Sequence, residues 1–391
     1  MEKLLKADAG IPGWLIAVFA VVAGVSVANI YYIQPLLNLV KLELGLNDFQ
    51  VSLISLCNQG GYAIGLFLII PLGDLLQRKG IILVNLGIAV AAALAISFAQ
   101  SVALVALACL VLGACSVTPQ LLIPLAAQCS RPPDKAKNMG IVLTGLLTGI
   151  IGSRVLSGVF GQVLGWRHVY LIVSALMLAC VLLIALTLPR VERGFAGGYR
   201  QLMASLFALP RRFPILVSHA LRYAFCFGSL LAMWTSLTFK LGGAPFYAPA
   251  GIIGLLGLCG VAGALTSSVI GRWVQRLGQR RFNLIGVILI MSAWLCLLLG
   301  QDGYSGIIAG IVLIDVGMQF IQLGNQTAAF ALAPDAVNRV NTIYMTIGFI
   351  GGALGTFCSG AAWHLIGWDG VVLVGLILAW VALILTLASR K

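Results

Sequence analysis

The chain is a succession of long apolar stretches separated by short polar segments. Apolar residues make up 61% of its 391 residues and charged residues only 9%, whereas a soluble domain is roughly a quarter charged. A helix of about 20 apolar residues spans the ~30 Å hydrocarbon core of a bilayer and satisfies its own backbone hydrogen bonds there. The composition therefore predicts an all-α membrane protein.

Twelve apolar stretches are long enough to cross a membrane, six in each half of the chain. They lie at residues 14–37, 49–72, 80–99, 101–127, 138–164, 167–188, 214–240, 249–273, 281–300, 304–332, 339–365 and 368–388. We predict twelve transmembrane helices in two six-helix bundles, residues 1–188 and 214–391. Residues 189–213, rich in arginine and proline, are expected to form a basic cytoplasmic linker between the bundles.

One short pattern occurs in both halves. A Ser-Gly pair followed after six residues by Gly-Trp is found at residues 157–166 and again at 359–368, a displacement of 202 residues. The same displacement pairs Gln120 with Gln322. A period of half the chain excludes short-repeat solenoids and indicates two copies of one large unit, so the two bundles are expected to be pseudo-symmetric.

The lysines and arginines are concentrated in the segments predicted to lie on one side of the membrane. If the N-terminus is cytoplasmic, 19 of the 24 lysines and arginines fall in cytoplasmic segments, and the outer segments keep only Lys41, Arg167 and Lys240. The positive-inside rule therefore predicts that both termini are cytoplasmic. This distribution accounts for the net charge of +13 without nucleic-acid binding, and the basic linker is suited to lie against anionic lipid.

Asp315 is the only acidic residue deep inside an apolar stretch. Eleven residues into the segment 304–332, at 1.5 Å each, it lies ~16 Å deep, near the midplane. A charge there is costly and by default marks a functional site, although a structural ion pair is the simpler alternative. Gln319, Gln322 and Gln326 continue one helix face from Asp315, which favours a water-lined cavity over mere bonding between helices.

Arg154 and Arg222 are the only basic residues well inside the predicted helices. Arg222 can reach the nearer membrane surface, so anchoring and function are equally good interpretations. Arg154 lies nearer the middle and is interpreted either as a ligand for a substrate anion or as a structural contact to the helix of Asp315 or to a backbone carbonyl. Burial disfavours a charged carboxylate and a nearby cation favours it, so movement of Arg154 would switch the proton affinity of Asp315.

The first apolar stretch carries polar residues just before Pro35. Asn29 and Tyr32 form one short face, and Tyr31, Gln34 and Asn38 form another. The tyrosines could be interfacial anchors. We nevertheless include Asn29, Tyr32 and Gln34 among the expected substrate-binding residues, together with Gln120, Arg154, Arg222, Gln319, Gln322 and Gln326.

The doubled six-helix plan and the segment from Leu72 to Lys79 resemble the major facilitator superfamily. The signature of its second loop, Gly-x-Leu-x-Asp-Arg-x-Gly-Arg-Lys, is matched by Leu72, Asp74, Arg78 and Lys79. The resemblance implies that Asp74, Arg78 and Lys79 form a cytoplasmic gate, although the arginine and lysine charges could simply follow topology.

Within that superfamily, residues 28–37 and 315–326 are similar to drug:proton antiporters and predicted sugar efflux permeases of bacteria. Two positions differ: the antiporters' helix-four arginine is Cys109 here, and their helix-five Gly-Pro pair is Ser153 and Arg154. We therefore take Asp315 and Arg154 as the expected proton-coupling pair.

The leading hypothesis is a proton-coupled exporter of a small drug, sugar or metabolite, working by alternating access in the bacterial inner membrane as a monomer. The alternative is a proton symporter that imports a small anionic nutrient. No His-Glu-x-x-His, P-loop or Gly-x-Ser-x-Gly motif is present, so an enzyme is not expected, nor is a cofactor or metal. A receptor is disfavoured because only the linker offers an output surface.

Overall fold

The computed structural model describes Leu5, Asp8 and residues 10–189, 198–270, 277–333 and 336–388, without the side chains of residues 74, 136 and 267–269. Every regular segment longer than one residue in this part of the chain is helical. The first half contains α1 (Gly13–Ala28), α2 (Ile33–Leu44), α3 (Asp48–Leu68), α4 (Leu72–Leu75), α5 (Arg78–Phe98), α6 (Val102–Cys115), α7 (Pro119–Cys129), η1 (Pro132–Asp134), α8 (Lys135–Leu164) and α9 (Trp166–Thr187).

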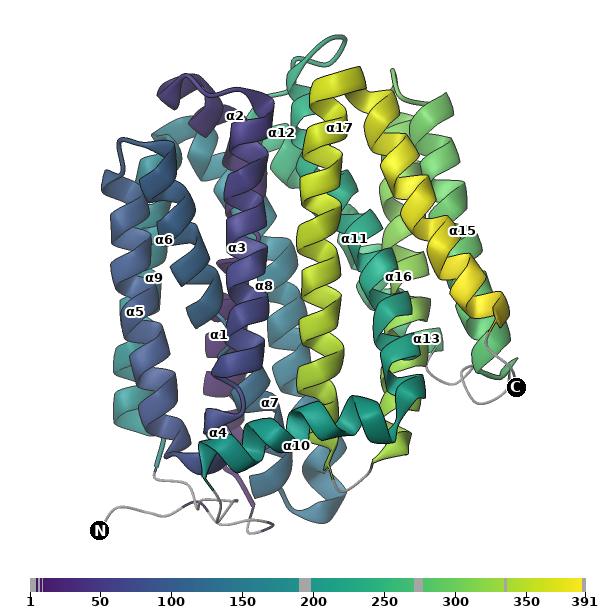
Figure 1. Ribbon diagram of the computed structural model, residues 1–391. Helices are drawn as coiled ribbons and strands as arrows, with labels where there is room; N and C mark the ends of the chain where they lie inside the picture. The colour runs from purple at the N-terminus through teal and green to yellow at the C-terminus, as the bar shows by residue number, and fades with distance from the viewer. Residues whose placement is uncertain are drawn as a thin grey trace.

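The first half is followed by α10 (Tyr199–Arg212), a helix inside the predicted linker. The second half contains α11 (Pro214–Gly242), α12 (Ala250–Leu255), η2 (Leu256–Cys259), α13 (Gly260–Ile270), α15 (Gln279–Leu299), α16 (Tyr304–Leu332) and α17 (Val337–Ala388). Non-helical angles at Ile366 and Gly367 turn α17 back on itself. The two halves stand side by side, with α3 and α17 adjacent at the centre (Figure 1).

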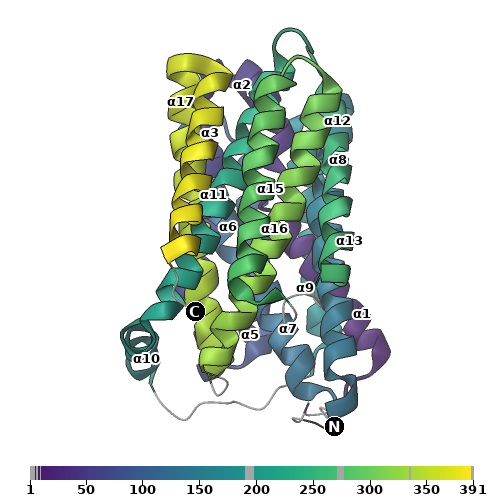
Figure 2. The same ribbon diagram turned by 90° about the vertical axis from the view of Figure 1, so that its right-hand side faces the viewer.

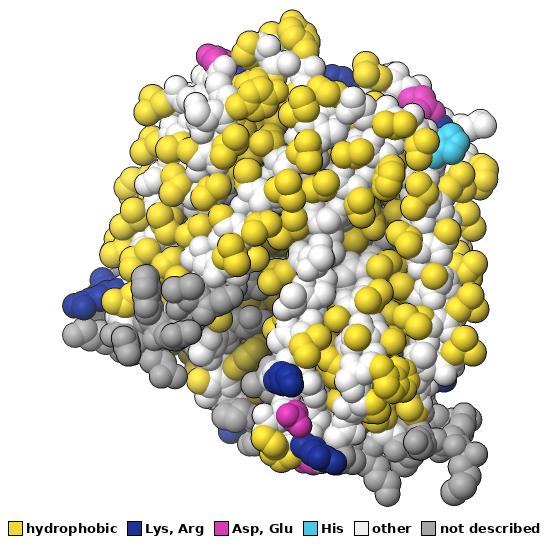
Figure 3. Space-filling model, turned by 180° about the vertical axis from the view of Figure 1, so that it is seen from behind, with side chains coloured by type: hydrophobic (Ala, Val, Ile, Leu, Met, Phe, Trp, Pro, Cys, Tyr) yellow, Lys and Arg dark blue, Asp and Glu magenta, His cyan; other side chains and the backbone are white. Residues whose placement is uncertain are grey.

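The outer surface is that of a membrane protein. Ten of the described helical segments are long and apolar enough to cross a bilayer, and Ala250–Thr266 is a shorter apolar segment. On the face seen in Figure 3, hydrophobic side chains cover the middle of the molecule and charged side chains gather at its two ends. This belt matches the apolar layer in which such helices are stable.

Glycines let equivalent helices of the two halves pack backbone to backbone. A Cβ atom at Gly149 of α8 would lie 2.2 Å from the carbonyl oxygen of Gly24 in α1, and one at Gly355 of α17 would lie 2.2 Å from that of Gly228 in α11. Small residues at such contacts allow the close approach that holds membrane helices together. The same packing in both halves supports the duplication.

The repeated Ser-Gly pair lies where one half meets the other. A Cβ at Gly158 of α8 would be 2.5 Å from the carbonyl oxygen of Ala250 in α12, and one at Gly360 of α17 would be 2.2 Å from the hydroxyl of Ser52 in α3. The repeated Gly-Trp pair makes the following turn, where Gly165 has φ +82° and Gly367 has φ +65°. The pattern therefore marks both contacts between halves and the turns beside them.

The helix α10 runs across one end of the molecule, beneath both halves (Figures 1 and 2). Its Leu202, Leu206 and Leu209 are buried against the bundle. The hydroxyl of Tyr199 donates to the carbonyl of Leu68 at 3.3 Å, and the carboxyl end of α10 leads directly into α11. Much of the expected linker is thus a packed helix; we call this side of the molecule the α10 end.

Adding one methyl group at the α1–α8 contact should destabilise the protein. Gly149→Ala forces a Cβ against the backbone of Gly24, and overpacking of this kind costs about 1–3 kcal/mol. The expected result is a lower thermal unfolding temperature of the purified protein in detergent. Gly152→Ala in the same helix is the control, because no atom lies within 4 Å of that Cβ position. Equal unfolding temperatures for the two variants would contradict the packing argument.

Candidate functional site

The first transmembrane segment is interrupted near its middle, between α1 and α2. Pro35 has no backbone N–H, so it cannot bond to the carbonyl of Tyr31, and a tight turn replaces regular helix there. The side-chain amide of Asn58 donates to the carbonyls of Asn29 at 3.1 Å and Ile30 at 3.2 Å. The interruption is therefore hydrogen-bonded, and it turns Tyr31 and Gln34 toward the second half.

Arg154 of α8 lies against this interruption. Its side chain is 5% exposed, and its Nε donates to Oε1 of Gln34 at 2.9 Å. The guanidinium also stacks on two aromatic rings, 4.8 Å from the centroid of Tyr31 and 4.1 Å from that of Trp234. Cation–π contacts of this kind stabilise a desolvated cation. Trp234 belongs to α11, so the two halves hold the arginine together.

Asp315 of α16 approaches the same place from the second half. Its carboxylate interacts with the guanidinium of Arg154 and lies near the indole of Trp234. Arg154 and Asp315 are nevertheless not among the ion pairs within 4.0 Å formed by the described residues. The two charged groups are thus neighbours where the halves meet but lie more than 4.0 Å apart, and their expected proton-coupling role stays a prediction.

The segment α12–η2–α13 provides a glycine surface for both charged residues. A Cβ at Gly257 would lie 2.9 Å from Cβ of Arg154, and one at Gly260 would lie 3.5 Å from Oδ2 of Asp315. Gly257 lies within the 3₁₀ helix η2 and Gly260 directly follows it; a 3₁₀ helix is tighter than an α-helix and is often found at hinges. The absence of side chains lets this backbone approach both groups closely.

Three polar atoms at this site are buried without a hydrogen bond of ordinary geometry in the described part of the chain: Nε2 of Gln34, Nε1 of Trp234 and Oδ2 of Asp315. Buried polar groups normally have partners. Two of the three are donors and one is an acceptor, beside a guanidinium. The arrangement can therefore bind a small polar molecule, and it can hold a proton on the carboxylate.

The end of the site away from α10 is closed by hydrogen bonds between the halves. The amide of Asn38 donates to the carbonyl of Thr238 at 2.7 Å, and the hydroxyl of Thr238 donates to the carbonyl of Gln34 at 3.0 Å. Farther out, the indole of Trp363 donates to Asp48 at 3.1 Å. These contacts position Gln34 and separate the site from that surface.

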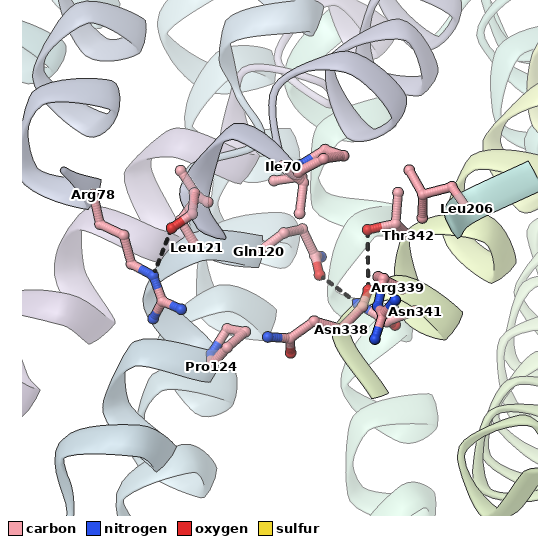
Figure 4. A pocket seen from close by; sticks show the side chains of 12 residues that line it. Ile70, Arg78, Gln120, Leu121, Pro124, Leu206, Asn338, Arg339, Asn341 and Thr342 are labelled. Carbon is pink, nitrogen blue, oxygen red and sulfur yellow. Dashed lines mark hydrogen bonds between the residues drawn. The ribbon is translucent and has the colours of Figure 1, made fainter. Parts of the chain in front are cut away.

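The predicted glutamine stripe extends from Asp315 toward the α10 end. Gln319 and Gln322 are partly buried on α16, and the amide of Gln326 donates to Asn341 of α17 at 3.1 Å. Asn341 in turn donates to Oε1 of Gln120 in α7 at 3.2 Å. Gln120 thus lies apart from Arg154 and joins the two halves in a second pocket (Figure 4).

Of the expected gate residues, Arg78 lines that pocket and Lys79 follows it at the start of α5 (Figure 4). Arg78 is buried, and its Nε donates to the carbonyl of Gly73 at 3.1 Å. Lys79 is partly buried and donates to the carbonyl of Ala185 at the end of α9, at 2.8 Å. The side chain of Asp74 lies outside the described residues. Arg78 and Lys79 therefore brace the end of the first half, and their expected gate role stays a prediction.

Arg222 is held within the second half, apart from Arg154. Its guanidinium donates to Oδ1 of Asn325 at 2.6 Å and to the carbonyl of Leu385 at 2.9 Å. Asn325 also donates to Asn283 at 2.8 Å. Of the two interpretations left open for Arg222, anchoring is the one these contacts favour, because they tie α11, α15, α16 and α17 together.

Asn29 and Tyr32, two more of the expected substrate-binding residues, lie away from Arg154. Tyr31 and Trp234, which contact Arg154, were not among the expected substrate-binding residues. The amide of Asn29 donates to Ser116 at 3.1 Å inside the first half, and Tyr32 is buried in the same core. Tyr31, its neighbour, contacts Arg154 instead, together with Trp234. The repeat could have indicated Trp234: it stands 203 residues after Tyr31, within one position of the displacement that relates the halves.

A membrane-embedded bundle of two similar halves, with a polar site enclosed between them, defines a secondary transporter. The family model described as the Major Facilitator Superfamily matches residues 15–356 and 248–391, and the chain belongs to that superfamily. It is a transporter and not an enzyme, as predicted.

Relatives and solved structures agree with this assignment. The chain is 34% identical over 370 residues to the uncharacterized transporter YgaY of Escherichia coli O157:H7, covering 95% of this chain and 94% of that one. It is 28% identical to the "Probable sugar efflux transporter" of Mannheimia succiniciproducens, covering 70% and 68%. The crystal structure of a mutant of the nucleoside transporter NupG has the same fold, with a TM-score of 0.72 and 15% identity over 96% of this chain and 98% of that chain.

Replacing Arg222 should destabilise the second half. Arg222→Met removes the donors that satisfy Asn325 and the Leu385 carbonyl, and leaving a buried acceptor without a partner costs about 1–3 kcal/mol. We expect a lower thermal unfolding temperature in detergent. Arg281→Met, at an exposed position in α15, should leave it unchanged. An unchanged unfolding temperature for Arg222→Met would contradict an anchoring role.

Proposed function

We propose that the protein is a proton-coupled exporter of a small organic molecule, which binds between the halves at Arg154, Gln34, Trp234 and Asp315. The observation that carries this proposal is the set of three buried polar atoms, beside the Arg154 guanidinium, that lack a hydrogen bond of ordinary geometry in the described part of the chain. Two of them, on Asp315 and Trp234, lie near each other. Both halves contribute to the set. A change in their relative position would therefore alter the binding site and its access together, as alternating access requires.

Coupling to protons follows from the two opposite charges. Asp315 faces the cation of Arg154 without a close ion pair, in an environment where a carboxylate alone would tend to be neutral. If the halves separate at Arg154, Asp315 gains a proton; if they approach, it loses one. Exchange requires that substrate and proton compete: a substrate that donates hydrogen bonds to the ionised Asp315 carboxylate favours its charged form and displaces the proton.

The proposal includes the finer topology. Counting the two arms of α17 separately and including Ala250–Thr266 gives twelve membrane segments in two bundles, residues 1–188 and 214–391, joined by residues 189–213. Both termini and α10 would then face the cytoplasm of a bacterium, with the protein in its inner membrane as a monomer. The excess of basic residues in these segments supports that orientation.

A second candidate is import of a small anion together with a proton. It is favoured by the donors at the site: the guanidinium of Arg154, the amide of Gln34 and the indole of Trp234 all suit a carboxylate or phosphate group. Export is preferred because one relative is named as a sugar efflux transporter.

Neutralising Asp315 should abolish proton coupling. We expect purified Asp315→Asn to fold with an unfolding temperature close to that of the unmodified protein and to lose transport driven by a pH gradient in proteoliposomes. A substrate is first found by thermal stabilisation with a panel of sugars, nucleosides and organic anions, because a ligand that binds the folded state stabilises it. Asp369→Asn, at an exposed position, is the control that should transport normally. Retained pH-driven transport by Asp315→Asn would overturn the proposed coupling.

The direction of transport distinguishes the two candidates. In proteoliposomes with an acidic interior, an exporter that exchanges substrate for protons accumulates substrate inside, whereas a symporter releases it. We expect accumulation in that arrangement. Accumulation only with an acidic exterior would favour the symporter.

A further inference from the structure

A separate pocket lies between α10 and the α10 end of the second half. Its described lining comes from three places: Ser205, Ala208, Leu209, Arg212 and Phe213 at the end of α10, Leu332 and Ala333 at the end of α16, and Ala336 and Arg339 at the start of α17. The residues that form the central site, Gln34, Arg154, Trp234 and Asp315, do not line this pocket. The pocket has a different chemical character from that site and no part in the proposed transport step.

Two arginines give the pocket a positive charge. Arg212 is exposed and its guanidinium lies 5.3 Å from the ring centroid of Phe213, and Arg339 is partly buried at the start of α17. The described lining residues include no acidic side chain; Asp335, between Ala333 and Ala336 in sequence, is outside the described residues. The described lining therefore suits an anionic ligand.

The rest of the described lining is almost wholly apolar, and the pocket lies at the level of a membrane surface. Leu209, Phe213 and Leu332 are its larger apolar residues, and Phe207, elsewhere on α10, is 59% exposed. The helix α10 lies across the ends of the spanning helices (Figure 1), where the headgroups of the bilayer would be. A partly buried helix with basic and exposed apolar residues is typical of the membrane interface.

We propose that this pocket binds an anionic phospholipid, with the phosphate at Arg212 and Arg339 and the start of an acyl chain against Leu209, Phe213 and Leu332. A free phosphate would use the two arginines but leave the apolar lining empty. A lipid uses both, and basic pockets beside transmembrane helices are suited to lipid headgroups. Because the lining comes from α10, α16 and α17, the bound lipid would fix the linker helix to the second half.

The test compares lipids of different charge on purified protein. Short-chain phosphatidylglycerol is titrated into the detergent-solubilised protein, and the unfolding temperature is followed, with phosphatidylcholine and inorganic phosphate in parallel. We expect saturable stabilisation by phosphatidylglycerol alone. Removing an arginine near a headgroup costs about 1 kcal/mol, or about fivefold in affinity, so Arg212→Gln/Arg339→Gln should weaken apparent binding about thirtyfold.

The matched control is Arg200→Gln/Arg281→Gln, which removes the same charge from exposed positions outside the pocket and should keep near-normal affinity. Equal loss in both double variants would show a diffuse electrostatic effect and overturn the pocket assignment. Stabilisation by inorganic phosphate at the same concentrations would instead indicate a free-anion site. Arg212→Gln alone, at an exposed position, provides the comparison should the double variant fail to fold.

Discussion

The buried guanidinium of Arg154, in the middle of an apolar bundle, determines which side chains must surround it. Lipid offers Arg154 no hydrogen bonds, so the protein must supply acceptors and aromatic faces within a few ångströms. Gln34 and Tyr31 supply them from the first half and Trp234 from the second. The interrupted first segment, the glycine surface of α12–η2 and the approach of α16 all serve the placement of this one group.

Glycine determines how closely the surrounding helices approach. Equivalent contacts of α1 with α8 and of α11 with α17 form the interior of each half, whereas Gly158 and Gly360 lie between halves. The duplicated sequence thus builds one kind of contact inside the halves and another between them. The charged residues break this symmetry: Thr356 stands 202 residues after Arg154 and donates to Gln59 at 2.9 Å. One half carries a cation where the other carries a neutral hydrogen bond.

The sequence alone predicted the helical membrane fold and its duplication, because apolar length and repeated residues report directly on lipid and on helix contacts. The family and the transporter class were predicted from the resemblance of the segment Leu72 to Lys79 to the superfamily signature. The sequence also singled out Arg154 and Asp315, since the cost of burying each charge demands a partner, but it left open whether Arg154 pairs with Asp315, a substrate anion or a backbone carbonyl. The direction in which individual side chains point was harder to predict from the sequence. Periodicity within a regular helix cannot tell Tyr31 from Tyr32 at an interruption, where the chain follows a turn. Gln120 and Arg222 were grouped with the site by polarity, but tertiary packing places them in other clusters.

The 3₁₀ helix η2 makes the segment beside Arg154 and Asp315 longer than an α-helix of the same residues would be. Four residues span about 8 Å in a 3₁₀ helix and about 6 Å in an α-helix. Conversion of Leu256–Cys259 to α-helix would shorten the segment by about 2 Å and rotate α13 relative to α12 by roughly 80°. Gly257 and Gly260 would then no longer face the two charged residues together. A change of helix type in a single turn would be enough to alter what each charge touches, with no new bond to the substrate.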